Sequence, residues 1–165
     1  MKFGITSMDY GSLGTLIASL LVQGFDLIGC NYDEIGNYYF NEDNVNAMSC
    51  WINRDKYSNP NMDLDLDALK KEVADLASLT IAYETFKAQE TIYDYKTLFD
   101  INLSPTQLFF VAFGNLFCQT NNDDINNSVD ANKKHLLRVL RHSMDFRKAF
   151  KCPGNLSMFA CVAYS

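Results

Sequence analysis

Residues 68–89, ALKKEVADLASLTIAYETFKAQ, are the stretch that decides the fold. Apolar side chains recur along it every three or four positions, which is the period of one face of an α-helix. This stripe consists of Leu69, Val73, Leu76, Leu79, Ala82, Tyr83 and Phe86. Asp63, Asp65 and Asp67 lie just ahead of it, where acidic side chains favour the positive end of a helix dipole. The pattern predicts an amphipathic helix from about Ala68 to Gln89 that packs against a core.

Apolar segments on either side predict two further buried helices. Residues 12–23 carry a second stripe, formed by Leu13, Leu16, Ile17, Leu20 and Leu21, and Gly24 follows where a helix stop is expected. Ser104-Pro105 opens a third helix, with proline at its first position, that runs to about Cys118 and is apolar nearly all round. We expect both helices to be buried, the first of them through its leucine stripe.

The remaining segments are polar or short. Residues 26–61 are rich in Asn, Asp, Tyr and Gly, which predicts a loop with one short helix near 45–51. Another loop is expected at 119–132, before a basic amphipathic helix at 133–142 and a short helical segment at 144–150. The chain is therefore predicted to be mainly α.

Length and charge exclude several classes of function. The 165 residues, 48% of them hydrophobic, can bury one core of ordinary size, so we expect one domain over residues 1–165. The net charge is −6 and the Lys and Arg residues form no stripe, so nucleic acid is not an expected partner. No apolar run reaches the roughly 18 residues of a membrane span. Lys2 precedes an apolar stretch of signal-peptide length, but Asp9 and the missing small-x-small cleavage pattern favour an internal helix.

Four segments, taken in order, resemble the neprilysin and endothelin-converting enzyme family of zinc endopeptidases. They are DYGSLG at 9–14 leading to QGFD at 23–26, EVAD at 72–75, QLFF at 107–110 with Cys118, and FRKAFKC at 146–152. Each is weak alone, but their order and spacing cover nearly the whole chain. The resemblance implies a mainly α, zincin-like C-terminal catalytic lobe, truncated and degenerate, as a single domain over 1–165.

The same resemblance assigns the family's zinc site to positions that no longer suit it. In the family, H-E-x-x-H supplies two ligands and the general base, and E-N-x-x-D supplies the third ligand. The ligands fall on Ser19, Gln23 and Lys71 and the base on Leu20, while the Asp is kept as Asp75. Zinc catalysis needs three good ligands, and the metal that they hold lowers the pKa of its bound water to about 7. We expect zinc to be lost, Leu20 to fill the old site as core, and Lys71 to pair with Asp75.

The alignment leaves two further family positions undecided. One is a His that steadies the oxyanion, and the other is an Arg that binds substrate carbonyls. Counting back from Phe146 places them at Val129 and His135, whereas counting forward from Cys118 places the His at His135. His135 is either a relic of substrate binding or a solvated residue, and its neighbours Lys133 and Lys134 favour the second reading.

The five cysteines show no C-x-x-C spacing, and their odd number leaves at least one thiol unpaired or paired elsewhere. By resemblance, Cys50 and Cys161 form a disulfide within the lobe. Cys118 and Cys152 resemble cysteines whose partners lie in the family's N-terminal lobe, and Cys30 is unassigned. Because that lobe is absent from these 165 residues, we expect surface that the family buries to be exposed here, favouring self-association or a separate partner.

Three readings of the function follow. The first is a non-catalytic homologue that has lost its zinc ligands and general base and binds a peptide or a protein, including a separate N-terminal lobe. The second is an active zinc metalloendopeptidase with substitute ligands, for which the sequence offers only two histidines, His135 and His142. The third is a truncated gene product without a selected function. Family resemblance places the chain outside the cell or at its surface, although it shows no convincing signal peptide.

Overall fold

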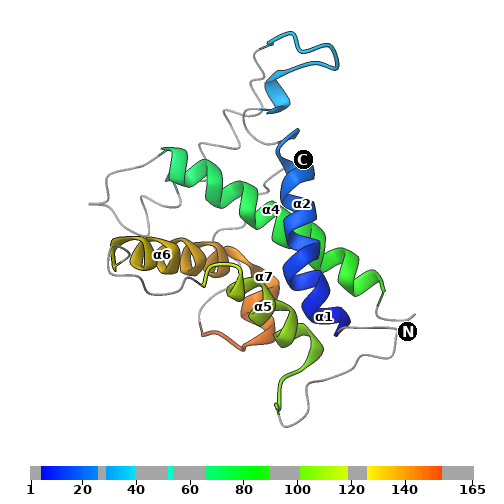
Figure 1. The fold of residues 1–165 in the computed structure, drawn as a ribbon, viewed down its shortest axis with the longest axis vertical. Coiled ribbons are helices and arrows are strands. Elements are labelled where there is room, and N and C mark those ends of the chain that lie inside the picture. The colour runs from blue at the N-terminus through cyan, green and yellow to red at the C-terminus, as the bar shows by residue number, and fades with distance from the viewer. Residues whose placement is uncertain are drawn as a thin grey trace.

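The computed structural model describes residues 5–25, 29–39, 52–53, 66–89, 101–118 and 126–153, except the side chains at 30, 66 and 126–130. Within these ranges the chain is built from helices and contains no strand (Figure 1). The helices are α1 (Thr6–Asp9), the π-helical η1 (Tyr10–Gly14), α2 (Thr15–Val22), the 3₁₀ turn η2 (Gly29–Asn31), α4 (Leu66–Ala88), α5 (Pro105–Asn115), α6 (Asn126–His142) and α7 (Met144–Ala149). The prediction of a mainly α fold is confirmed.

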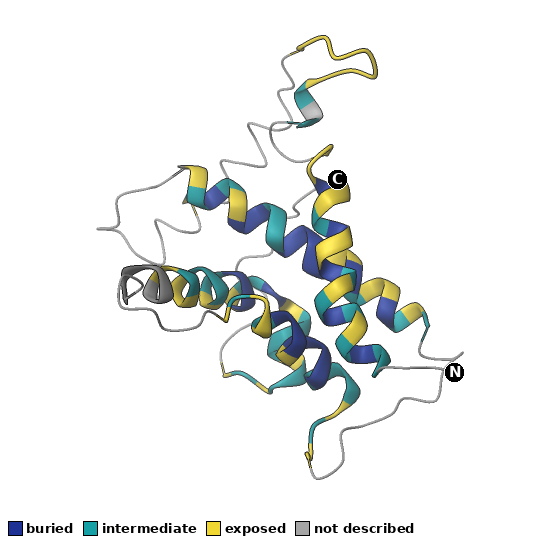
Figure 2. Ribbon diagram, in the orientation of Figure 1, coloured by how far each residue is buried: buried dark blue, intermediate teal, exposed yellow. Residues whose placement is uncertain are grey.

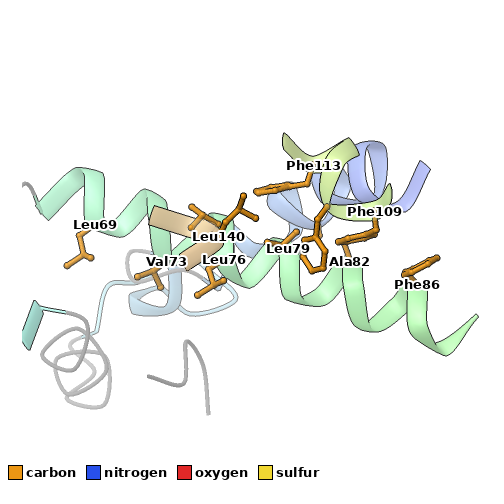
Figure 3. Close-up of a cluster of buried hydrophobic side chains, with 12 residues drawn as sticks. Leu69, Val73, Leu76, Leu79, Ala82, Phe86, Phe109, Phe113 and Leu140 are labelled. Carbon is orange, nitrogen blue, oxygen red and sulfur yellow. The ribbon is translucent and has the colours of Figure 1, made fainter. Parts of the chain in front are cut away.

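Helix α4 is the element around which the others are arranged. It contacts η1, α2 and α6, while α5 packs against α1, η1 and α7 (Figure 1). The stripe predicted from the sequence is its buried side: Leu69, Val73, Leu79 and Phe86 are almost fully enclosed (Figure 3). The period of the apolar residues was therefore sufficient to find both the helix and its buried face.

Aromatic rings fill the core where α4 meets α5. Phe86 stacks on Phe109 with ring centroids 5.5 Å apart, and Tyr83 stacks on Phe110 at 5.4 Å. Phe110 also meets Phe146 of α7 edge to face at 5.4 Å. Offset and edge-to-face pairs of this kind add to the stabilisation that burial already provides. These contacts hold α4, α5 and α7 in one core.

The start of α5 is fixed by the residues that the sequence singled out. Ser104 accepts a hydrogen bond from the Gln107 backbone N–H at 3.2 Å, and the Gln107 side chain accepts one from the Ser104 N–H at 2.9 Å. This is a complete capping box, with Pro105 at the first helical position. Gln107 also donates to the Ala149 carbonyl at 3.1 Å, which ties the start of α5 to the end of α7.

The first three helical segments form a continuous rod, and its orientation corrects the sequence prediction. The residues of η1 and α2 that face α4 and α5 are Gly11, Thr15, Ala18 and Val22, all buried. The expected buried stripe faces outward instead (Figure 2): Leu13, Leu16, Ile17, Leu20 and Leu21 are 48–69% exposed. The helices approach too closely to admit large side chains, because a Cβ on Gly11 would lie 2.1 Å from the carbonyl oxygen of Phe109.

The loop predicted at 26–61 is described only in part. Tyr32 and Tyr38 form an antiparallel bridge around a turn in which Asp33 accepts hydrogen bonds from the Asn37 N–H at 2.8 Å and the Ile35 N–H at 3.0 Å. These hydrogen bonds hold the pKa of the Asp33 carboxyl below its ordinary value. The short helix expected at 45–51 lies outside the described residues. Among the helices that the structure describes, none has both the length and the hydropathy that a bilayer span requires.

Candidate functional site

Helix α2 carries three of the four positions assigned to the zinc site. Ser19 lies in its last turn, where its hydroxyl donates to the Leu16 carbonyl at 2.8 Å. Leu20 follows with its side chain 69% exposed, and the exposed Gln23 is the C-cap. The expectation that Leu20 fills the old site as core is wrong, because the side of α2 that meets α4 is the one with small residues.

Helix α4 carries the fourth position, Lys71, and the retained Asp75. The predicted ion pair between them is not formed. Lys71 is exposed, whereas the half-buried Asp75 carboxylate lies against α6 and contacts His135 there. The absence of the Lys71–Asp75 pair costs little, because an exposed pair one turn apart on a helix contributes only about 0.3–0.5 kcal/mol.

His135 is held between α4 and the end of α5. Its Nε2 lies 2.6 Å from an Asp75 carboxylate oxygen, and its side chain is only 13% exposed. The Phe117 ring lies against the imidazole with centroids 5.6 Å apart. His135 is therefore not the solvated surface residue that its basic neighbours indicated. A carboxylate bound to one ring nitrogen fixes the orientation of the ring.

An ion pair joins the same two helices one turn away. Arg138 Nε donates to a Glu72 carboxylate oxygen at 3.0 Å, and the Glu72 side chain is only 3% exposed. A carboxylate buried to this extent is costly unless an opposite charge and hydrogen bonds compensate for the lost water. Arg138 supplies the opposite charge and a hydrogen bond to one of the two Glu72 carboxylate oxygens.

Sequence reasoning missed this pairing, although a signal was present. Glu72 and Asp75 are three residues apart on α4, and His135 and Arg138 are three residues apart on α6, so each pair lies on one helix face. The pairs join in reverse order, Asp75 to His135 and Glu72 to Arg138. Matching spacings of opposite charge could have predicted the contact. We call these four residues the α4–α6 charge clamp.

The side chains at the assigned ligand positions do not fit a zinc site. They offer a hydroxyl, an amide and an ammonium group, whereas zinc is held by imidazole, thiolate or carboxylate. Within the described ranges, no three His, Cys, Asp or Glu side chains are grouped so that they could hold a metal ion.

Other predicted site residues are placed only in part. Val129 lies within α6, but its side chain is among those not described. Cys50 and Cys161 both lie outside the described residues, so their predicted disulfide stays a prediction. Cys118 and Cys152 are free thiols, and Cys118 is exposed.

Comparison with known proteins identifies the family of this chain. The model of Peptidase family M13 matches residues 4–162. The chain is 28% identical to an endothelin-converting enzyme homolog of Locusta migratoria over 164 residues, which cover 89% of this chain and 22% of the relative. It is 27% identical to neprilysin of Oryctolagus cuniculus, covering 92% and 23%. Neprilysin-2 of Caenorhabditis elegans is 30% identical, covering 91% and 23%.

The helical fold and the family match together place the chain among homologues of metallopeptidases. The chain belongs to peptidase family M13, which its match over nearly all residues shows. It spans about a fifth of the length of the curated relatives that it matches.

Proposed function

We propose that this chain is a non-catalytic homologue of the neprilysin-type metalloendopeptidases that binds a peptide or a protein. One observation carries the proposal: the positions assigned to the zinc ligands and the general base hold Ser19, Gln23, Lys71 and Leu20. None of these is a zinc ligand of the usual kinds, and an aliphatic side chain cannot accept a proton from water. Peptide hydrolysis by the family's route has no chemical groups to support it here.

The structural surroundings of these positions support the same reading. The Ser19 hydroxyl is already used within the helix, in its 2.8 Å hydrogen bond to the Leu16 carbonyl. The cation on Lys71 opposes the approach of Zn²⁺, because like charges repel. Leu20 presents an apolar surface where the family presents a carboxylate. The helix that carries catalysis in the family would thus serve for contact with a partner.

The cellular location of the proposed binding role is inferred from the family. We propose that the chain acts outside the cell or at its surface, as the resemblance implies. Its partner is a peptide or a protein, because the outward side of α2 offers apolar area and no charged group for a small ionic ligand.

Zinc content and peptidase activity, measured on the same protein, test the proposal. The full chain is purified without chelator, shown to be folded by circular dichroism, and analysed for zinc by elemental analysis. Cleavage of a general endopeptidase substrate is then measured with and without added zinc. We expect much less than one zinc per chain and no chelator-sensitive cleavage. One zinc per chain together with such cleavage would refute the proposal.

A rebuilt variant tests the assignment of the positions themselves. In S19H/L20E/Q23H/K71E, each ligand and the base are restored at the assigned residue, and S19H/Q23H serves as a matched control with two ligands only. If the assignment is right, the fourfold variant binds about one zinc per chain, and more tightly than the control, because a third ligand completes the set. Equal zinc affinity of the two variants would show that Lys71 does not occupy the third position.

A further inference from the structure

The outward side of α2 is an apolar surface, within the described part of the chain, that the core does not explain. We call Leu13, Leu16, Ile17, Leu20 and Leu21 the α2 leucine face; each is 48–69% exposed, and Phe25 just beyond them is 71% exposed (Figure 2). A surface helix ordinarily turns polar side chains outward and its apolar stripe inward. Here the large apolar residues are outside and the small ones inside.

This face also lacks charge. No Lys, Arg, Asp or Glu occurs between Tyr10 and Phe25, in a chain of which 21% of the residues are charged. Large apolar patches of this kind on a folded protein mark contact surfaces. A partner recognised by charge would need charged residues on or beside the face, so an apolar partner is favoured.

We propose that the α2 leucine face pairs with the same face of a second copy of this chain. The inference rests on the proposed binding role and names its partner. A two-fold contact requires a surface that complements itself, because each residue meets its symmetry-related neighbours. The face meets this condition: its members are spaced by three and four residues, which forms the ridges that pack between two helices. Being uncharged, it also brings no like charges together, although each copy carries a net charge of −6.

The exposed area is comparable to the apolar part of a standard interface. Full burial of a Leu or Ile side chain removes roughly 60–120 Å² from water, and that of a Phe about 150–250 Å². At the observed exposures, the α2 leucine face and Phe25 offer about 300–500 Å² per copy, or about 600–1,000 Å² for two. A standard interface of about 1,600 Å² has an apolar part of roughly 900 Å². The upper end of the estimate for two copies, about 1,000 Å², reaches this apolar area of roughly 900 Å².

Sedimentation equilibrium of the full chain over a range of concentrations tests the pairing. Reducing agent is included, because the exposed thiol of Cys118 would otherwise allow dimers linked by a disulfide. We expect a reversible equilibrium between monomer and dimer. A chain that stays monomeric at every concentration, or that forms aggregates of no fixed size, would overturn the proposal.

Charge variants of one residue locate the interface. I17E places carboxylates against each other across the two-fold contact and should weaken dimerisation at least tenfold. L137E is the matched control, because Leu137 on α6 is 52% exposed, like Ile17, but lies outside the face. I17K should also be monomeric, and mixing I17E with I17K should restore a dimer through opposite charges. Equal weakening by I17E and L137E, or no recovery on mixing, would refute a two-fold contact at α2. The zinc measurement decides the proposed function and the oligomeric state decides this inference, so each can fail alone.

Discussion

Replacing Gly11 with alanine would place a methyl group 2.1 Å from the carbonyl oxygen of Phe109, with the carbonyl carbon 2.9 Å away. A carbon and a carbonyl oxygen ordinarily approach no closer than about 3.3 Å, so η1 and α5 would have to separate by about 1 Å. Both obstructing atoms belong to the backbone of a buried helix, and no side-chain rotation can relieve the overlap. The rod that carries α2 is therefore held against α5 at a position where only glycine fits.

The expected loss of stability follows from two opposing effects. Overpacking a core costs about 1–3 kcal/mol, and a backbone obstacle places Gly11→Ala at the upper end of that range. Alanine regains about 1 kcal/mol through its higher helix propensity. We expect a net loss of about 2 kcal/mol, which lowers the melting temperature by about 4–8 °C for a chain of this size.

Gly14→Ala is the matched control for this prediction. Gly14 lies in the same helix η1, but the nearest atoms to a Cβ placed there are 3.6 Å away, an ordinary contact. Its stability should be unchanged or raised by up to about 1 kcal/mol. Urea and thermal unfolding of both variants, followed by circular dichroism, measure the difference. If Gly11→Ala were as stable as Gly14→Ala, the close approach of η1 and α5 would be refuted.

Three further predictions concern other contacts. Arg138→Ala should destabilise the fold by about 3 kcal/mol in urea unfolding, because it removes the guanidinium bound to the buried Glu72 carboxylate. The substitution Arg141→Ala, at an exposed residue of the same helix, serves as control, and a loss under about 1 kcal/mol for Arg138→Ala would contradict this role. Burial raises the pKa of the Tyr83 phenol above its ordinary value of 10.0, and the charge of Asp145 raises it further. The folded chain then keeps a proton that the unfolded chain releases, so this contribution to stability is complete below pH 10 and falls as the pH rises through the raised pKa. Tyr83→Phe should flatten that decline, and profiles of unfolding free energy against alkaline pH that run parallel for the two proteins would contradict this role of Tyr83. Ser104→Ala should cost about 1 kcal/mol by removing the cap of α5, whereas Ser104→Asp should keep most of it, and equal stability of these two variants would argue against the capping role.

Local patterns explain which parts of the fold the sequence could predict. The buried stripe of α4 and the start of α5 depend on periodicity and on capping residues within a few positions, and both predictions are confirmed. The exposed side of α2 depends on its partners. Its leucines and its small residues both form regular stripes, and the choice between them depends on the π-helical turn and on the close approach of Gly11 to α5.

The same distinction applies to the candidate site. The loss of zinc ligands at Ser19, Gln23 and Lys71 was inferred from residue identity and stays a proposal. The contact between Asp75 and His135 joins residues 60 positions apart, so it depends on how α4 and α6 are rotated against each other. Local sequence does not contain that rotation. The matching spacing of the opposite charges was the one available clue.

The π-helical segment η1 determines how α2, which follows it in the rod, is rotated about its axis. A π-helical turn accommodates one residue more than an α-helical turn, and the hydroxyl of Thr15 donates to the Gly11 carbonyl at 3.0 Å within it. If Tyr10–Gly14 tightened to regular α-helix without losing a residue, α2 would turn by about 100° around its own axis. Deleting one residue there would instead remove the wide turn and leave the same side chains outward. The single extra residue in this turn thus determines whether the large apolar or the small side chains of α2 face outward.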